Sequence, residues 1–172
     1  MYARFGLFIE GAWRASADGA TAPVFSPVTE QSLGDCPVAS VADTEAALAS
    51  AEVGFAAWKA KPAFDRAEAM HRIADEMIRR TDEAARMISL ETGKPIAQAG
   101  REWGQSIDQF RWYAEEARRI YGRIIESRVP GGRFEVHHDP VGVVAAFTAW
   151  NFPAALIARK VAPALAAGCS II

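Results

Sequence analysis

The residues with the clearest chemical potential follow an apolar run of strand length. The run is Val141–Thr148, and Ala149-Trp150-Asn151-Phe152-Pro153 leads from it into a helical pattern. Ligands of open α/β sheets bind outside the carboxyl ends of strands, where a helix N-terminus offers free N–H groups. The side-chain amide of Asn151 could donate a hydrogen bond to an anionic oxygen there, as an oxyanion hole requires. The alternative is that Asn151 only caps the following helix, which Asn often does.

No G-x-G-x-x-G pattern follows this run, so the ordinary dinucleotide-binding fingerprint is absent. On residue chemistry alone, the chain is a candidate ligand-binding α/β protein. One hypothesis that stays open is a different nucleotide-binding protein that shares only the strand, the loop and the helix.

A β-α-β pattern carries the candidate residues. Val141–Thr148 is continuously apolar, which is typical of a central parallel strand buried on both faces. We expect a helix over Ala154–Ala167 with Gly168 as its C-cap, and a second strand over Cys169–Ile172.

The first forty residues are rich in Gly, Pro, Ser and Asp and predict an edge of short antiparallel strands. The β-prone pieces are Leu7–Ile9, Val24–Ser26 and Leu33–Val38. The period then changes to that of a helix. Ser40 and Asp43 form a capping-box pattern at its start, and we expect it to end near Lys61–Pro62.

Two long amphipathic helices should follow, antiparallel because the link between them is short. One has an apolar stripe over Met70–Ile88 and closes at Gly93 as a left-handed cap. The other has its stripe over Ile96–Tyr121. We expect its aromatic residues in the core rather than against a cofactor; they are Trp103, Phe110 and Tyr113.

A two-stranded β-ribbon is predicted next, because Arg123–Val129 and Arg133–His138 flank a Pro-Gly-Gly turn. Two strands alone are marginally stable, so the ribbon should pair with another sheet, such as one in a second subunit. His137 and His138 are adjacent in this ribbon and point to opposite faces. That arrangement is poor for one metal ion, and no metal site is predicted.

Composition indicates an ordinary globular protein with no electrostatic footprint for nucleic acid or an anionic membrane. Of its 172 residues 51% are hydrophobic, and 19 basic against 21 acidic side chains give a net charge of −2. The first residues contain no apolar run of signal-peptide length, and no transmembrane span is expected. Two distant cysteines, Cys36 and Cys169, favour reduced thiols in a cytoplasmic protein. We expect Cys169 to be a buried residue rather than a nucleophile.

The chain also resembles the NAD(P)-dependent aldehyde dehydrogenase superfamily. The resemblance rests on Pro140–Pro153 and Ala158–Cys169, with Glu91–Pro95 and Phe8–Trp13 upstream, and so covers essentially the whole chain. It implies an α/β fold, the N-terminal part of the aldehyde dehydrogenase fold. That part comprises short strands, long amphipathic helices, an oligomerisation ribbon and the first β-α-β unit of a Rossmann-like cofactor domain.

The resemblance implies a mechanism as well. A cysteine thiolate attacks the aldehyde, hydride passes to NAD or NADP, and a glutamate-activated water hydrolyses the thioester. Asn151 would stabilise the tetrahedral oxyanion and lie beside the cofactor. The residues that would line the nicotinamide half of the cofactor site are Phe147, Thr148, Ala149 and Trp150. Ala149 stands where proline is common in the family, and Lys160 would lie close to the cofactor.

Ala158-Arg159-Lys160 is most similar to the succinate-semialdehyde dehydrogenase branch. By this resemblance Arg159 would bind the distal carboxylate of the substrate, a bidentate task that suits a guanidinium, and Phe152 would line the substrate site. The alternative for Arg159 is a structural ion pair or simple exposure.

The resemblance divides the chain into residues 1–122, the strands and helices of the cofactor-binding domain; 123–139, the oligomerisation ribbon; and 140–172, the truncated β-α-β unit. The family's glycine-rich loop, glutamate base and nucleophilic cysteine would follow Ile172, so we expect no aldehyde oxidation by this chain alone. A homodimer or homotetramer through the ribbon is expected. A non-catalytic assembly module is the alternative.

Overall fold

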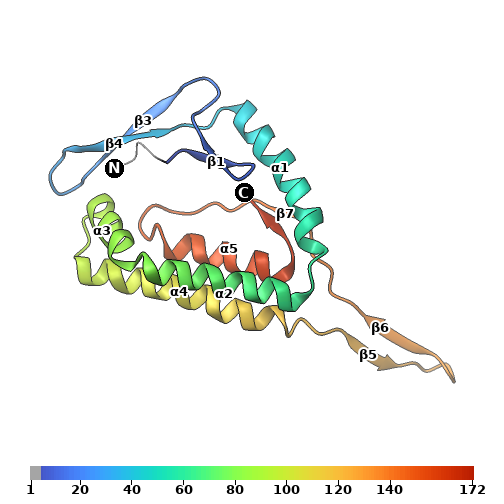
Figure 1. The fold of residues 1–172 in the computed structure, drawn as a ribbon. Helices are drawn as coiled ribbons and strands as arrows, with labels where there is room; N and C mark the ends of the chain where they lie inside the picture. The colour runs from blue at the N-terminus through green and yellow to red at the C-terminus, as the bar shows by residue number, and fades with distance from the viewer. Residues whose placement is uncertain (1–4) are drawn as a thin grey trace.

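The computed structural model describes residues 5–172. In chain order its elements are β1 (Leu7–Ile9), β2 (Ala12–Arg14), β3 (Thr21–Phe25), β4 (Ser32–Pro37), α1 (Val41–Lys59), α2 (Ala63–Arg79), α3 (Thr81–Thr92), α4 (Ile96–Ala117), β5 (Arg123–Glu126), β6 (Arg133–Val136), β7 (Val143–Val144), α5 (Ala155–Ala167) and β8 (Ser170–Ile171). The hairpins β1–β2 and β3–β4 lie across from a layer of helices, and α1 connects the two along one side (Figure 1). The predicted α/β class is confirmed.

The core lies where α2, α4 and α5 pack together. Its buried residues are Ala67, Met70, Ala74, Ile107, Phe110, Ala114, Ala117, Ala158, Ala162 and Ala166. The many alanines let the helix axes approach closely, because interaxial distance depends on the side chains at the contact. The helices α2 and α4 run antiparallel, as predicted, since His71 bonds to Glu115 while Met77 bonds to Trp103. Trp103 and Tyr113 pack partly buried against this core.

The helix predicted over Met70–Ile88 is in fact two helices, with the break at Arg80. The backbone of Arg80 has φ −103° and ψ 16°, outside the helical range. Two side-chain hydrogen bonds end on carbonyls beside the break: the Trp103 indole donates to Met77 O (2.8 Å), and the Thr81 hydroxyl donates to Ile78 O (2.8 Å). The amphipathic stripe does not reveal such a break, because the pattern continues across it.

Helix ends that depend on local signals agree with the sequence. The capping box of α1 is present: the Ser40 hydroxyl accepts from the Asp43 N–H, and the Asp43 carboxylate accepts from the Ser40 N–H. Gly93 and Gly168 both end their helices in the left-handed conformation, at φ 72° and φ 89°. By contrast α4 ends at Ala117, before the expected Tyr121.

The strand predicted over Val141–Thr148 is much shorter, and it is not buried on both faces. Only Val143–Val144 forms β7, which pairs in parallel with β8, and both its residues are half-buried. The ladder continues by one rung, because the Ala146 N–H donates to Ile172 O over 2.8 Å. A strand needs a partner along its length, and in residues 5–172 β7 pairs with β8 alone.

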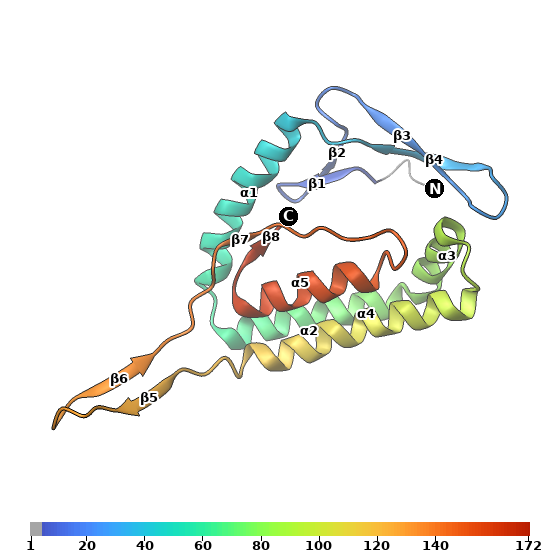
Figure 2. The same cartoon turned by 180° about the vertical axis from the view of Figure 1, so that it is seen from behind.

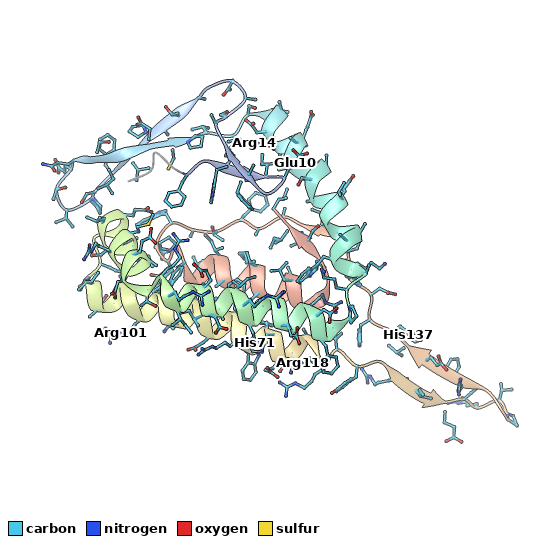
Figure 3. All side chains as sticks on the ribbon, in the orientation of Figure 1. Glu10, Arg14, His71, Arg101, Arg118 and His137 are labelled. Carbon is cyan, nitrogen blue, oxygen red and sulfur yellow. The ribbon has the colours of Figure 1, made fainter. Side chains whose placement is uncertain are left out.

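The ribbon β5–β6 projects from the body, as both views show (Figure 2). It is antiparallel, with Ile125 opposite Phe134, and is shorter than the predicted strands. Figure 3 places His137 beside it, away from the helices. Three apolar side chains of the ribbon are largely exposed: Ile124 at 73%, Ile125 at 47% and Phe134 at 61%. Exposed apolar surface of this kind is typical of a contact with another protein.

Candidate functional site

The candidate residues lie on the segment that leaves β7, passes alongside α5 and turns back into it (Figures 1 and 2). Asn151 is exposed at this turn. Within residues 5–172 its side-chain amide makes no hydrogen bond, while its backbone carbonyl accepts one from Lys94 Nζ over 3.1 Å. The amide is therefore free to donate to a ligand.

The alternative that Asn151 caps α5 is wrong. The N-cap of α5 is Ala154, and no side chain of its own segment caps it. The cap comes from Glu102 on α4, whose Oε1 accepts from the backbone N–H groups of Ala154 (3.0 Å) and Ala155 (3.2 Å). The expectation of free N–H groups at this helix start is corrected for Ala154 and Ala155, because a carboxylate already accepts both of their N–H groups.

Glu102 is itself held by Lys94, which precedes α4. Lys94 Nζ donates to Glu102 Oε2, and both side chains are largely buried, at 14% and 2% exposed. The same ammonium lies 4.1 Å from the ring centroid of Phe152, a cation–π distance. Sequence reasoning assigned no role to either residue. The available signal was a lone charge on the buried face of α4, between Ala99 and Ser106.

The residues predicted for the nicotinamide side share one exposed stretch. Phe147 and Trp150 are 87% and 81% exposed, and Thr148 and Ala149 between them are exposed too. Two large aromatic side chains left open at the carboxyl end of a parallel strand suit a flat apolar ring. Lys160 is exposed on α5 rather than on this stretch. The residues thus fit the ring end of a dinucleotide, whereas two N–H groups at the start of α5, which could have bound its phosphates, are taken by Glu102.

Arg159 and Phe152, the two predicted substrate residues, line one small cavity. Its volume is about 80 Å³, and Gln105, Ala155 and Leu156 complete its walls. The Arg159 guanidinium has no ion-pair partner in the part of the chain that the structure describes, so the structural ion pair is not seen there. A cation beside a cavity is what an anionic group on a substrate would need.

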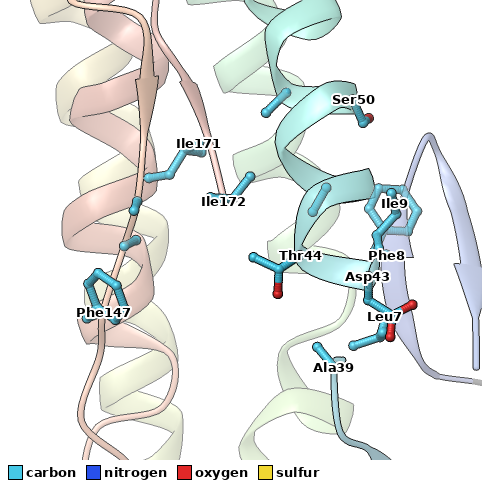
Figure 4. A pocket seen from close by; sticks show the side chains of 14 residues that line it. Leu7, Phe8, Ile9, Ala39, Asp43, Thr44, Ser50, Phe147, Ile171 and Ile172 are labelled. Atoms are coloured by element: carbon cyan, nitrogen blue, oxygen red, sulfur yellow. The ribbon is translucent and has the colours of Figure 1, made fainter. Parts of the chain in front are cut away.

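A larger groove of about 470 Å³ separates the β7–β8 pair from α1 and β1 (Figure 4). Phe147, Ile171 and Ile172 stand on one side, and Thr44 and Asp43 on the other. Hydrogen bonds from the Ser40 hydroxyl and N–H, followed by those from Ala17 and Ser16, lower the pKa of the Asp43 carboxyl from 3.8 to about 2. Asp43 therefore stays anionic at the groove's edge.

The two cysteines and the possible metal ligands of residues 5–172 were the other candidates for chemistry. Cys169 is buried in the core at 3% exposure, as predicted. Burial raises the pKa of the Cys36 thiol, helped by the negative charges of Glu91 and Asp35, so it stays protonated. In residues 5–172 no His, Cys, Asp and Glu side chains cluster as metal ligands. None of the helices described there has the length and apolarity to cross a membrane.

Known proteins share this sequence and fold. A glutarate-semialdehyde dehydrogenase of Pseudomonas aeruginosa is 41% identical over 96% of the chain and 34% of its own length. A succinate-semialdehyde dehydrogenase [NADP(+)], GabD of Escherichia coli, is 39% identical over 95% of the chain and 34% of its own. The crystal structure of PnpE in complex with nicotinamide adenine dinucleotide matches with a TM-score of 0.94 and 33% identity, covering 98% of this chain and 34% of PnpE.

The chain thus spans about a third of the length of the curated relatives it matches. The sequence profile of the aldehyde dehydrogenase family matches residues 13–172, nearly the whole chain. The chain belongs to the aldehyde dehydrogenase family.

Proposed function

We propose that this chain provides the oxyanion-binding Asn and the nicotinamide side of the active site in an NAD(P)-dependent aldehyde dehydrogenase. The activity belongs to a polypeptide that joins the chain to the rest of the family's fold, called the complete enzyme below. The observation that carries the proposal is the exposed Asn151 amide in the turn between β7 and α5, where Lys94 binds the Asn151 carbonyl and Glu102 on α4 binds the Ala154 N–H.

The role of Asn151 follows from its chemistry. When a thiolate adds to an aldehyde, the carbonyl oxygen becomes an anion that needs a hydrogen-bond donor. The side-chain NH₂ of Asn151 would donate to it. The cysteine and the glutamate base implied by the family would come from the rest of the fold. Bound NAD or NADP would accept the hydride, and Phe147, Thr148, Ala149, Trp150 and Lys160 would hold it beside Asn151.

The relatives support this cofactor class and a substrate class. The Escherichia coli relative is named for NADP(+), and PnpE was solved with the NAD form. Two relatives are named for glutarate and succinate semialdehydes, which carry a carboxylate at the end opposite the aldehyde. We therefore assign Arg159, with Phe152, to an acidic semialdehyde such as succinate semialdehyde.

Three further points belong to this proposal. The boundaries 1–122, 123–139 and 140–172 would separate the strands and helices of the cofactor-binding domain, the oligomerisation ribbon and the β-α-β unit. The ribbon would join subunits into a homodimer or homotetramer, because its apolar side chains are exposed. The two free thiols, Cys36 and Cys169, support a cytoplasmic location.

The test is Asn151→Ala in the complete enzyme, with Gln98→Ala as a control that removes an exposed amide elsewhere. We expect kcat on succinate semialdehyde to fall about a hundredfold or more for Asn151→Ala, since that is the usual cost of one oxyanion donor. Gln98→Ala should keep its kcat. Unchanged turnover in Asn151→Ala would mean that Asn151 is not the oxyanion donor, and absence of any turnover in the parent would favour the assembly module.

A further inference from the structure

We propose that the Lys94–Glu102 pair is a positioning device for Asn151, which holds the turn between β7 and α5 so that the amide points at the developing oxyanion. This inference rests on the proposed function and adds two residues to it. Neither would touch the substrate or the cofactor. Both would act through the backbone and ring of the turn.

Glu102 anchors the turn on its helical side. Its carboxylate is 2% exposed, and a buried carboxylate is costly unless every oxygen is satisfied. Oε1 accepts the N–H groups of Ala154 and Ala155, and Oε2 accepts from Lys94. Charge-assisted bonds of this kind are about twice as strong as neutral ones, so the start of α5 is firmly placed relative to α4.

Lys94 anchors the turn on its strand side. One ammonium group pairs with Glu102, donates to the Asn151 carbonyl over 3.1 Å and lies against the Phe152 ring at 4.1 Å. Its own backbone is tied down, because the Ser89 hydroxyl donates to the Lys94 carbonyl over 2.8 Å. Lys94, which lies between α3 and α4, thus holds Asn151 and Phe152 in place.

Together the two side chains secure four of the five residues from 151 to 155 while leaving the Asn151 amide free. An oxyanion donor requires this combination of a fixed backbone and a free side-chain amide. The donor must be fixed before the charge develops, because a group that has to reorganise loses much of its effect. A misplacement of about 1 Å can cost about a hundredfold in rate.

A merely structural pair would stabilise the fold without acting through Asn151, and a double-mutant cycle in the complete enzyme separates the two roles. The variants are Glu102→Gln, Asn151→Ala and their combination. The matched control is Glu115→Gln, which removes a carboxylate from the exposed part of the same helix α4. The readouts are kcat and KM for succinate semialdehyde, the Kd of NAD(P) by fluorescence quenching, and Tm.

We expect Glu102→Gln to lower kcat about tenfold or more with an unchanged Kd for NAD(P), and to add little further loss once Asn151 is already Ala. Glu115→Gln should match the parent. Full additivity of the two losses would overturn the positioning role while leaving Asn151 as oxyanion donor. Unchanged kcat in Glu102→Gln would do the same. If Asn151→Ala alone has no effect, the proposed function itself falls, and this inference with it.

Glu102→Gln leaves Lys94 buried without its counter-charge, and a second variant replaces it if thermal unfolding shows that it does not fold. The substitute is the double variant Lys94→Met/Glu102→Gln, which leaves no buried charge uncompensated. The same loss in kcat, again absent in the Asn151→Ala background, is expected from it. A folded double variant with parental kcat would overturn the proposal.

Discussion

The indole N–H of Trp103 on α4 donates to the carbonyl oxygen of Met77 over 2.8 Å, at the point where α2 stops and α3 begins. The Met77 carbonyl, in the last turn of α2, also accepts the backbone N–H of Arg80 over 3.2 Å, so it has both a backbone and a side-chain donor. The indole bond also fixes the register of the two antiparallel helices. The Trp103 side chain therefore links the C-terminal end of α2 to the core in which α4 packs.

Trp103→Phe should weaken this junction. The change keeps an aromatic ring but removes the donor, and a buried hydrogen bond of this type contributes about 1 kcal/mol. Amide hydrogen exchange in the complete enzyme measures the free energy of local opening at the α2–α4 contact. We expect this free energy to fall by about 1 kcal/mol. Trp112→Phe, which changes a 64% exposed indole on the same helix, is the control. Equal protection in both variants would contradict the role of this bond.

Arg159→Gln should change substrate preference rather than the chemistry. The substitution removes the cation beside the cavity of Phe152 and Gln105. We expect KM for succinate semialdehyde to rise at least about tenfold, since a lost charged partner typically costs 1.5 kcal/mol or more. KM for a neutral aliphatic aldehyde should stay within about twofold. An equal rise in KM for both substrates would mean that Arg159 does not bind the carboxylate of the semialdehyde.

The lowered pKa of Asp43 predicts that the junction between α1 and the loop before β3 loses stability in acid. Its pKa is lowered from 3.8 to about 2 by hydrogen bonds from Ser40, Ala17 and Ser16. A group whose pKa is lower in the folded state contributes its full stability above the unfolded value, here 3.8, and loses it as pH falls toward 2. In the parent, the protection of the Ala17 and Ser40 amides, taken relative to the intrinsic exchange rate at each pH, should fall in that window. Asp43→Asn should show fast exchange already at neutral pH.

The ribbon predicts a subunit contact. Ile125 and Phe134 lie opposite each other across β5 and β6 and remain exposed. Phe134→Asp places a charge on that apolar face, so we expect a smaller mass for the complete enzyme in size-exclusion chromatography with light scattering. Arg133→Gln, a polar change next to it, should leave the mass unchanged. Retention of the parental mass by Phe134→Asp would exclude this ribbon face from the contact.

Several features were correctly predicted because their causes are local. The capping box of Ser40 and Asp43 spans three residues, and the left-handed ends at Gly93 and Gly168 need only a residue without a Cβ. The pairing of the ribbon strands around a Pro-Gly-Gly turn is local in the same sense. The family, too, was recognisable from the Trp150–Pro153 block and its flanks.

Features decided by distant residues were missed. Trp103 binds the end of α2 where the long predicted helix breaks, and β7 pairs only where β8 lies beside it; both partners are distant in sequence. Asn151 had the residue type and position of a helix cap, and only the fold shows that Glu102 takes that role. The physical reason is that a buried carboxylate charge outcompetes a neutral amide for two N–H groups at a helix start.

By itself, then, the sequence determined the class of fold, the family and the candidate residue Asn151. Tertiary structure alone decided what holds that residue in place. Glu102 lies 52 and 53 residues before the two N–H groups it binds, and Lys94 lies 57 residues before the carbonyl it binds. No periodicity or propensity encodes such distances, because the contacts exist only after α4 and α5 have packed together.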